Sequence, residues 1–218
     1  MIELPKFENK WDYINGFYLT SPNRELVKIL SYWELYEKIS DTPGDIIDCG
    51  IFKGSSLIRF ATYRNMINMP FARQIVGFDT FGKFPETDYE NDKQKREQFV
   101  EQAGEESLNT EQIRQVLNQK NLNRNIELVE GDINNTVPEF IDSNPNIRIA
   151  LLHIDVDIYE PTVTIMESLY DHVVDGGIVI IDNYGDFDGE STAVENHLGT
   201  SEDIRPMPYG VGGAYIVK

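Results

Sequence analysis

The sequence predicts an α/β domain in which a parallel β-sheet is covered by helices on both faces. Short apolar runs alternate with helix-like stretches along most of the 218 residues, the mark of such a sheet. Runs such as 149–154 are apolar at nearly every position, as in strands buried on both sides. The length suits one domain with a sizeable core, so we predict a single domain over residues 1–218.

The chain begins with an N-terminal helical segment, over about residues 1–42. Its first 22 residues are rich in aromatics but irregular in spacing. From Asn23 to about Ile39 the apolar residues have helical spacing, and Asp41-Thr42-Pro43-Gly44 ends the helix. The strands expected after it are Ile46–Cys49, Ile75–Phe78, Ile126–Val129, Ile149–Asp155, Ile178–Asp182 and Ala214–Val217. The helices expected between them are Ser55–Met66, about Asn134–Asp142 and Thr162–Val174.

A long polar segment, about residues 82–125, separates two of these strands and is predicted to contain helices at Glu90–Ala103 and Thr110–Lys120. An insertion of this length near a site is often a lid or a substrate-recognition element. A solvated pair of surface helices is the alternative.

The bulk composition excludes several classes of function. The net charge of −18, from 37 acidic and 19 basic residues, argues against binding nucleic acid or an anionic membrane through a basic surface. The single cysteine, Cys49, allows no internal disulfide and is expected to be a buried thiol. The N-terminus lacks the features of a signal peptide, and no apolar run approaches the roughly 20 residues that span a bilayer. We therefore expect a cytoplasmic protein.

A glycine turn follows the first strand, in Asp48-Cys49-Gly50-Ile51-Phe52-Lys53-Gly54-Ser55-Ser56. Gly50 and Gly54 allow a tight turn and close approach to a ligand at a helix N-terminus. The G-x-x-x-G spacing departs from the G-x-G-x-x-G of nicotinamide dinucleotide sites, which disfavours a dehydrogenase. A purely structural turn is the alternative. Lys53 either meets a ligand carboxylate or is solvent-exposed.

Acidic and amide side chains follow four further strands. Asp79 is placed to accept the hydroxyls of a ribose, and Asp132 either bonds an adenine amino group or caps the next helix. Four oxygen-bearing side chains follow the two most apolar strands, at the edge where ligands bind in open α/β sheets. The alternative to a ligand site is that these side chains cap the helices that follow. These four are Asp155, Asp157, Asp182 and Asn183.

The ordered motifs resemble class I S-adenosylmethionine-dependent methyltransferases, and more narrowly the macrocin and novobiocin sugar O-methyltransferase family. The resemblance covers about residues 24–218 and is most specific at 79–85, 151–162 and 176–184. It implies a Rossmann-like, seven-stranded, mostly parallel sheet whose last strand, 213–217, is antiparallel. It also implies that S-adenosylmethionine contacts Asp48, Gly50, Phe52, Lys53, Gly54, Ser55, Asp79, Thr80, Asp132, Ile133 and Asp155.

The same resemblance implies a divalent metal ion, usually magnesium, at Asp155, Asp182 and Asn183, with Asp157 as the general base. Two carboxylates and an amide form a hard oxygen set that suits Mg²⁺. Asn183 departs from the family, which commonly has two adjacent aspartates at this point. The departure resembles catechol-type O-methyltransferases, lowers the local negative charge and is expected to weaken metal affinity.

The function expected from the sequence is Mg²⁺-dependent O-methylation of a small-molecule hydroxyl, on a deoxysugar or a glycosylated natural product, by a homo-oligomer. Part of the 82–125 insertion and the N-terminal aromatics would cover the acceptor. One alternative is a catechol-like phenol methyltransferase, against which the lack of a lysine just after Asp155 argues. Another is a non-catalytic S-adenosylmethionine-binding protein.

Overall fold

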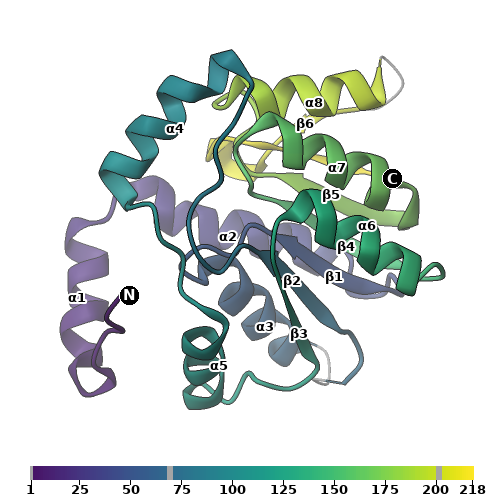
Figure 1. Cartoon of the computed structure of the whole chain (residues 1–218). Coiled ribbons are helices and arrows are strands. Elements are labelled where there is room, and N and C mark those ends of the chain that lie inside the picture. The colour runs from purple at the N-terminus through teal and green to yellow at the C-terminus, as the bar shows by residue number, and fades with distance from the viewer. Residues whose placement is uncertain (1, 68–70, 200–202) are drawn as a thin grey trace.

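The computed structural model describes residues 2–67, 71–199 and 203–218, and its centre is one seven-stranded sheet (Figure 1). The strand order is β3-β2-β1-β4-β5-β7-β6. All neighbours from β3 to β5 pair in parallel, whereas β7 is antiparallel to both β5 and β6. The strands are β1 Asp45–Cys49, β2 Ile75–Asp79, β3 Ile126–Glu130, β4 Ile149–Ile154, β5 Val173–Ile181, β6 Arg205–Pro206 and β7 Ala214–Val217.

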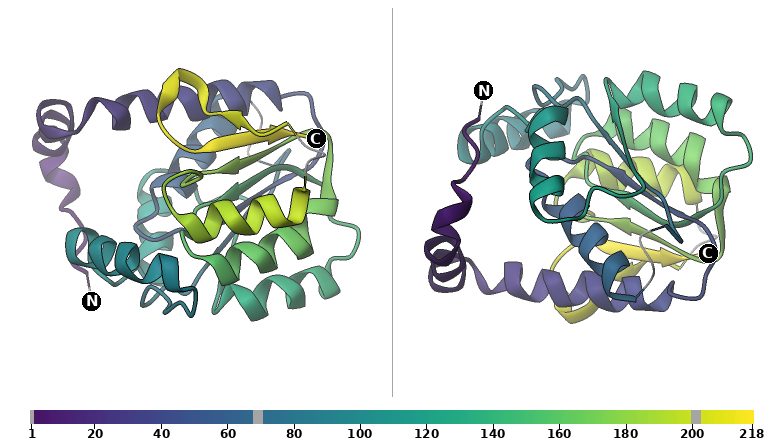
Figure 2. Two further views of the ribbon diagram at one scale, coloured as in Figure 1. Left: turned by 90° about the horizontal axis from the view of Figure 1, so that it is seen from above. Right: turned by 90° about the horizontal axis from the view of Figure 1, so that it is seen from below.

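Helices cover both faces of the sheet (Figure 1, Figure 2). One apolar core joins the sheet to α2, α3 and α5, and a second joins its other face to α6, α7 and α8. The predicted fold class and the antiparallel last strand are thus confirmed. The helices are α1 Lys10–Thr20, α2 Asn23–Lys38, α3 Ser55–Ile67, α4 Glu90–Ala103, α5 Thr110–Gln119, α6 Ile133–Ser143, α7 Tyr159–Leu169 and α8 Asp188–Leu198.

The central strands are buried because their side chains are apolar on both faces. Every residue of β2 and β4 is buried, which is what the continuous apolar runs predict. The pairing of β4 with β5 sets Ile154 beside Ile181, so the residues after both strands emerge together at the carboxyl edge. The predicted site lies on the loops at this edge.

The expected N-terminal helical segment contains α1 and α2. None of the residues of α1 is buried, which is why the spacing of the apolar residues in the first 22 positions is irregular. One local prediction was wrong. The helix expected over Thr162–Val174 ends earlier, at Leu169, because a 3₁₀ turn and then β5 begin there. The two-residue strand β6 was not predicted, since a run so short has no periodicity. Among the described residues, no helix combines the length and apolarity needed to cross a membrane.

Candidate active site

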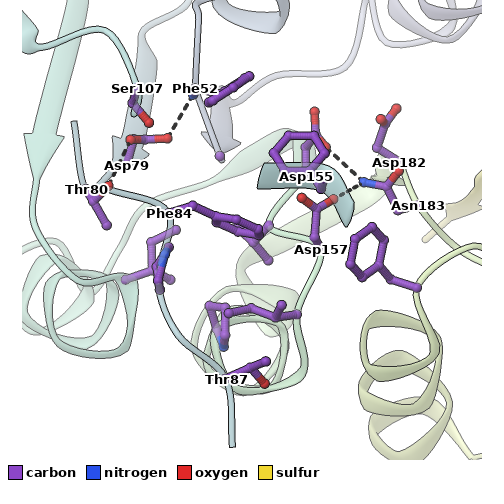
Figure 3. A pocket seen from close by; sticks show the side chains of 18 of the residues that line it. Phe52, Asp79, Thr80, Phe84, Thr87, Ser107, Asp155, Asp157, Asp182 and Asn183 are labelled. Atoms are coloured by element: carbon purple, nitrogen blue, oxygen red, sulfur yellow. Dashed lines mark hydrogen bonds between the residues drawn. The ribbon is translucent and has the colours of Figure 1, made fainter. Parts of the chain in front are cut away.

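One cavity of about 850 Å³ lies at the carboxyl edge of the sheet. Figure 3 shows its two ends: Phe52, Asp79 and Thr80 at one, and the side chains that follow β4 and β5 at the other. The structure thus brings together the four oxygen-bearing side chains that the sequence singles out at the strand ends. They are Asp155, Asp157, Asp182 and Asn183.

Asn183 joins two of the carboxylates (Figure 3). Its Nδ2 donates to Asp155 Oδ1 at 3.1 Å and also to Asp157 Oδ1. The loops that carry these residues are held by Glu190, a fully buried side chain of α8 that the sequence analysis missed. Its carboxylate accepts the backbone N–H of Asn183 at 2.9 Å and that of Asp157 at 3.2 Å. Glu190 therefore fixes the β4 and β5 loops relative to each other.

The cluster has more buried negative charge than its side-chain partners balance. Burial, with Asp182 as the next cause, raises the pKa of Asp155 to about 8 and the pKa of Asp157 to about 7. Burial would also raise the pKa of Asp182, but Lys28 and His153 outweigh it, so that pKa is lowered. A donor atom of Asp155, one of Asp182 and one of His153 lie within 4.8 Å of one another. Clustered carboxylates of this kind suit a divalent cation.

The backbone of Asp157 is strained. Its φ is +65°, in the left-handed region that non-glycine residues seldom occupy. The side chain is nonetheless buried in the cavity wall, beside Asn183. Strain of this kind persists only where the surrounding structure imposes it, and it is concentrated at functional sites.

Two side chains from α2 reach the site, and the sequence analysis missed both. Lys28 Nζ lies 2.5 Å from Asp182 Oδ2, and the Tyr32 hydroxyl donates to the other oxygen, Asp182 Oδ1. The two residues are one helical turn apart, so they lie on one face of α2. A lysine does therefore reach this site, although none lies in the stretch just after Asp155. No local pattern signals it, because the two residues in contact are 154 positions apart.

A buried hydrogen-bond chain continues from Tyr32 to the glycine turn. The Tyr32 hydroxyl lies 2.9 Å from His153 Nε2, and His153 Nδ1 lies 2.7 Å from Asp48 Oδ1. Asp48 Oδ2 accepts from Ser56 Oγ at 2.9 Å, at the start of α3. All four residues are buried. His153 is a hydrogen-bonded core histidine, and Asp48 lies beneath the cavity instead of lining it.

The glycine turn depends on Gly50 and Asp79. Gly50 has φ +93°, and a Cβ there would lie 1.8 Å from the carbonyl oxygen of Asp155, so only glycine fits. Asp79 Oδ2 accepts the backbone N–H groups of Ile51 at 2.9 Å and Phe52 at 2.8 Å (Figure 3). Asp79 therefore shapes the turn in addition to lining the cavity.

Most of the predicted cofactor residues line this cavity, and three do not. Lys53 donates to the carbonyl of Ala103 at 2.5 Å and lies on the outside, while Gly54 is close to Ile113 in the core. Asp132 caps α6 by accepting the N–H of Asn134 at 2.9 Å, which is one of the two roles predicted for it. It also lines the cavity. The predicted residues that line it are Gly50, Phe52, Ser55, Asp79, Thr80, Asp132, Ile133 and Asp155.

The first half of the 82–125 segment forms one wall of the cavity. Phe84 and Phe99 pack against each other, and Phe99 packs against Phe52 of the glycine turn. In the second half, Ser107 still lines the cavity, whereas α5 does not reach it, because α5 buries Ile113 and Leu117 in the core. The N-terminal aromatics, expected to cover the acceptor, are absent from the cavity wall as far as the described residues show, since α1 lies away from the sheet (Figure 2).

Two carboxylates, the partly buried Glu160 and the buried Asp92, anchor this wall. Glu160 of α7 accepts the Thr87 hydroxyl at 2.9 Å and the backbone N–H of Asp88 at 2.8 Å, in the loop before α4. Asp92 of α4 accepts the N–H groups of Tyr159 at 3.0 Å and Gly189 at 2.9 Å.

The fold and the site together define a Rossmann-like methyltransferase. A family model described as macrocin-O-methyltransferase (TylF) matches residues 34–207, and the chain belongs to that family. Among solved structures, the calicheamicin methyltransferase CalS11 is 28% identical, with a TM-score of 0.76 over 95% of this chain and 85% of that chain. The O-methyltransferase NovP, at 21% identity and a TM-score of 0.74, covers 89% of this chain and 79% of that one and shares the fold.

Two curated relatives act on natural products. A tetracenomycin-C 4'-O-methyltransferase of Streptomyces olivaceus, whose name specifies a dimethoxy-rhamnosyl substrate, is 29% identical over 160 residues. Demethyldecarbamoylnovobiocin O-methyltransferase of Streptomyces niveus is 27% identical over 151 residues. The matches cover 72% and 66% of this chain but only 59% and 54% of those proteins, so the chain spans a little over half the length of the curated relatives.

Proposed function

We propose that this protein is an S-adenosylmethionine-dependent O-methyltransferase that acts on a hydroxyl of a deoxysugar or glycosylated natural product with the aid of a divalent metal ion, Mg²⁺ or a similar cation. The observation that carries the proposal is the single cavity with two chemically different ends. One end has the glycine turn and Asp79, and the other has the acidic cluster after β4 and β5. Methyl transfer requires the cofactor and the acceptor to lie in the same cavity, because the attacking oxygen must approach the sulfonium methyl in line.

The cofactor end of the cavity has carboxylates that can accept hydrogen bonds from a ribose and an adenine. Asp79 has a second oxygen, Oδ1, that accepts the N–H of Phe81 at 2.6 Å and faces the side where Thr80 lies. A carboxylate has about four acceptor positions, and backbone N–H groups take three of them in Asp79. The fourth faces the Thr80 hydroxyl at 3.4 Å, and a ribose hydroxyl can take it because the Thr80 hydroxyl also has the carbonyl of Lys83 at 2.9 Å. Asp132 and Ile133 line the wall at the start of α6, where an adenine amino group would meet a carboxylate.

The acceptor end offers a base and a cation site. Asp157, with its pKa raised to about 7, is suited to take a proton from an acceptor hydroxyl near neutral pH. Asp155, Asp182 and Asn183 would hold the metal ion, which when bound orients two acceptor oxygens and eases loss of a proton. Asn183 would then turn its amide so that its oxygen, and not Nδ2, faces the carboxylates.

The class of acceptor is proposed from the relatives. Besides the tetracenomycin and novobiocin enzymes, a second CalS11 structure is titled TDP-rhamnose 3'-O-methyltransferase, at 28% identity and a TM-score of 0.69 over 97% of this chain and 86% of that one. Two of these names, those of the tetracenomycin enzyme and of CalS11, specify a rhamnose, which supports a sugar hydroxyl over a phenol. The lysine argument against a catechol-like mechanism no longer holds, because Lys28 reaches the site from α2.

The test is transfer of a labelled methyl group from S-adenosylmethionine to a panel of rhamnosides, other deoxysugar glycosides and catechols. We expect transfer to a sugar acceptor that is lost on chelation and restored by Mg²⁺. Asp157→Asn should abolish transfer while S-adenosylhomocysteine still binds. Transfer that persists in the chelator would refute the metal dependence, and full activity of Asp157→Asn would refute the assignment of the base.

A further inference from the structure

Asp182, one of the three residues proposed to hold the metal ion, already has both carboxylate oxygens engaged. Lys28 Nζ lies 2.5 Å from Oδ2, and the Tyr32 hydroxyl donates to Oδ1. Asp182 is almost fully enclosed, with 8% of its side chain exposed. A metal ion that binds this carboxylate must therefore displace one of the two donors or share an oxygen with it.

Tyr32 is the fixed partner of the two. Its side chain is fully buried, and its ring packs against those of Phe60 and His153. Its hydroxyl is also tied to His153 Nε2 at 2.9 Å. Moving this ring would break the hydrogen-bond chain to Asp48 and open the core, so Tyr32 is not the donor that gives way.

Lys28 is the movable partner. Its ammonium is carried by a flexible four-carbon stem, and 20% of its side chain is exposed. It also lines a second, smaller cavity of about 260 Å³, together with Arg24, Asp182, Asp186 and the glycine loop at 212–213. Within this cavity the stem can carry the ammonium from Asp182 toward Asp186, a carboxylate that also pairs with Lys95.

The Lys28 ammonium and a divalent metal ion are both positively charged, so only one of them can neutralise Asp182 at a time. The carboxylates of Asp155 and Asp182 both attract Lys28, so the ammonium supplies positive charge to the position a metal ion would use. Arg24, the other basic residue among the described residues that line the main cavity, is largely exposed and pairs with Glu25. A dication and an ammonium held against one carboxylate repel each other.

We infer that Lys28 is a built-in counter-ion that competes with the divalent metal ion for Asp182. The inference rests on the metal site of the proposed function and adds a positioning role for a residue of α2. In the metal-free protein Lys28 neutralises Asp182 and keeps the cluster in place. When a metal ion binds, the ammonium moves off Asp182 toward the Asp186 side of the second cavity.

The direct test is calorimetric titration of Mn²⁺ into chelator-treated protein, for wild type and three variants. Lys28→Met removes the charge and keeps the stem, Lys28→Arg keeps the charge, and Lys38→Met is the matched control. Lys38 is on the same helix and pairs only at the surface, with Glu34 at 3.0 Å. If the Lys28 ion pair is formed in about nine molecules in ten, its removal should tighten Mn²⁺ binding about tenfold. Lys28→Arg and Lys38→Met should bind Mn²⁺ as wild type does.

Equal or weaker Mn²⁺ binding by Lys28→Met would overturn the competition and leave the metal site standing. Absence of Mn²⁺ binding in all four proteins would refute the metal part of the proposed function and this inference with it. A second measurement avoids reliance on variants that fail to fold. Acylation of lysines in the wild-type protein, mapped by mass spectrometry, should increase at Lys28 when Mg²⁺ is added and stay constant at Lys38. Unchanged labelling of Lys28 would contradict the inference.

Discussion

Replacing Asp157 with asparagine should stabilise the metal-free protein while it destroys activity. The Asp157 carboxyl is buried, and its pKa is raised from 3.8 to about 7 because burial and the nearby Asp182 disfavour its charged form. A carboxyl whose pKa is raised by folding contributes stability below the pKa of the unfolded chain. That contribution is lost as the pH rises through about 4 to 7. Asparagine keeps an oxygen that accepts from Asn183 and removes the charge.

The magnitude follows from the two pKa values. At 1.36 kcal/mol per pH unit, the raised pKa of Asp157 costs the wild-type fold about 2 kcal/mol at pH 5, where folding must protonate the carboxyl, and about 4 kcal/mol at pH 8, where the buried carboxyl is ionised. Urea unfolding in the presence of a chelator should therefore show Asp157→Asn to be more stable than wild type, with a larger gain at pH 8 than at pH 5. The same variant should lose methyl transfer by about 10²- to 10⁴-fold. A gain that is equal at both pH values, or a variant less stable than wild type at pH 8, would refute the assignment of a buried, strained charge.

Three further substitutions test other parts of the site. Tyr32→Phe removes the hydroxyl that donates to Asp182 and should lower the free energy of unfolding by about 1–3 kcal/mol, measured in urea, because a buried acceptor loses its partner; unchanged stability would show that the hydroxyl is dispensable. Gly50→Ala should abolish S-adenosylhomocysteine binding or folding, since the added Cβ meets backbone at 1.8 Å. Gly104→Ala, with nothing within 4 Å of the added Cβ, should cost only the backbone strain of its positive φ, about 1–3 kcal/mol. Glu160→Gln should raise the KM for the acceptor several-fold with little change in cofactor affinity, because it loosens the loop before α4. Weakened cofactor binding with an unchanged KM for the acceptor would contradict the assignment of this loop to the acceptor end of the cavity.

The sheet and the strand-end acids were predictable from sequence because they depend on short-range patterns. Continuous apolar runs identify β1, β2, β4 and the apolar end of β5, and the residues after such strands meet at one edge whatever the details of packing. The same logic brings Asp155 and Asp182 together without knowledge of any other contact. A glycine turn after β1 also follows from local chemistry, since Gly50 alone tolerates the close approach of the β4 loop.

What could not be predicted depends on contacts between distant segments. Lys28 and Tyr32 lie 154 and 150 residues before Asp182, and their spacing on α2 is what any amphipathic helix would show. Glu190 is an ordinary acidic residue in the first turn of α8, and only the folded chain shows that it accepts N–H groups from two loops. The helix α1 buries none of its residues, so no periodic signal exists.

The most direct test of the proposed function is calorimetric titration of S-adenosylhomocysteine into the wild-type protein, with and without Mg²⁺. The cavity that joins the glycine turn to the acidic cluster predicts one site per chain with a dissociation constant in the micromolar range, and binding that is lost in Gly50→Ala. Absence of binding in both conditions, by a protein that unfolds cooperatively, would contradict the assignment of the cofactor and with it the role given to Asp157.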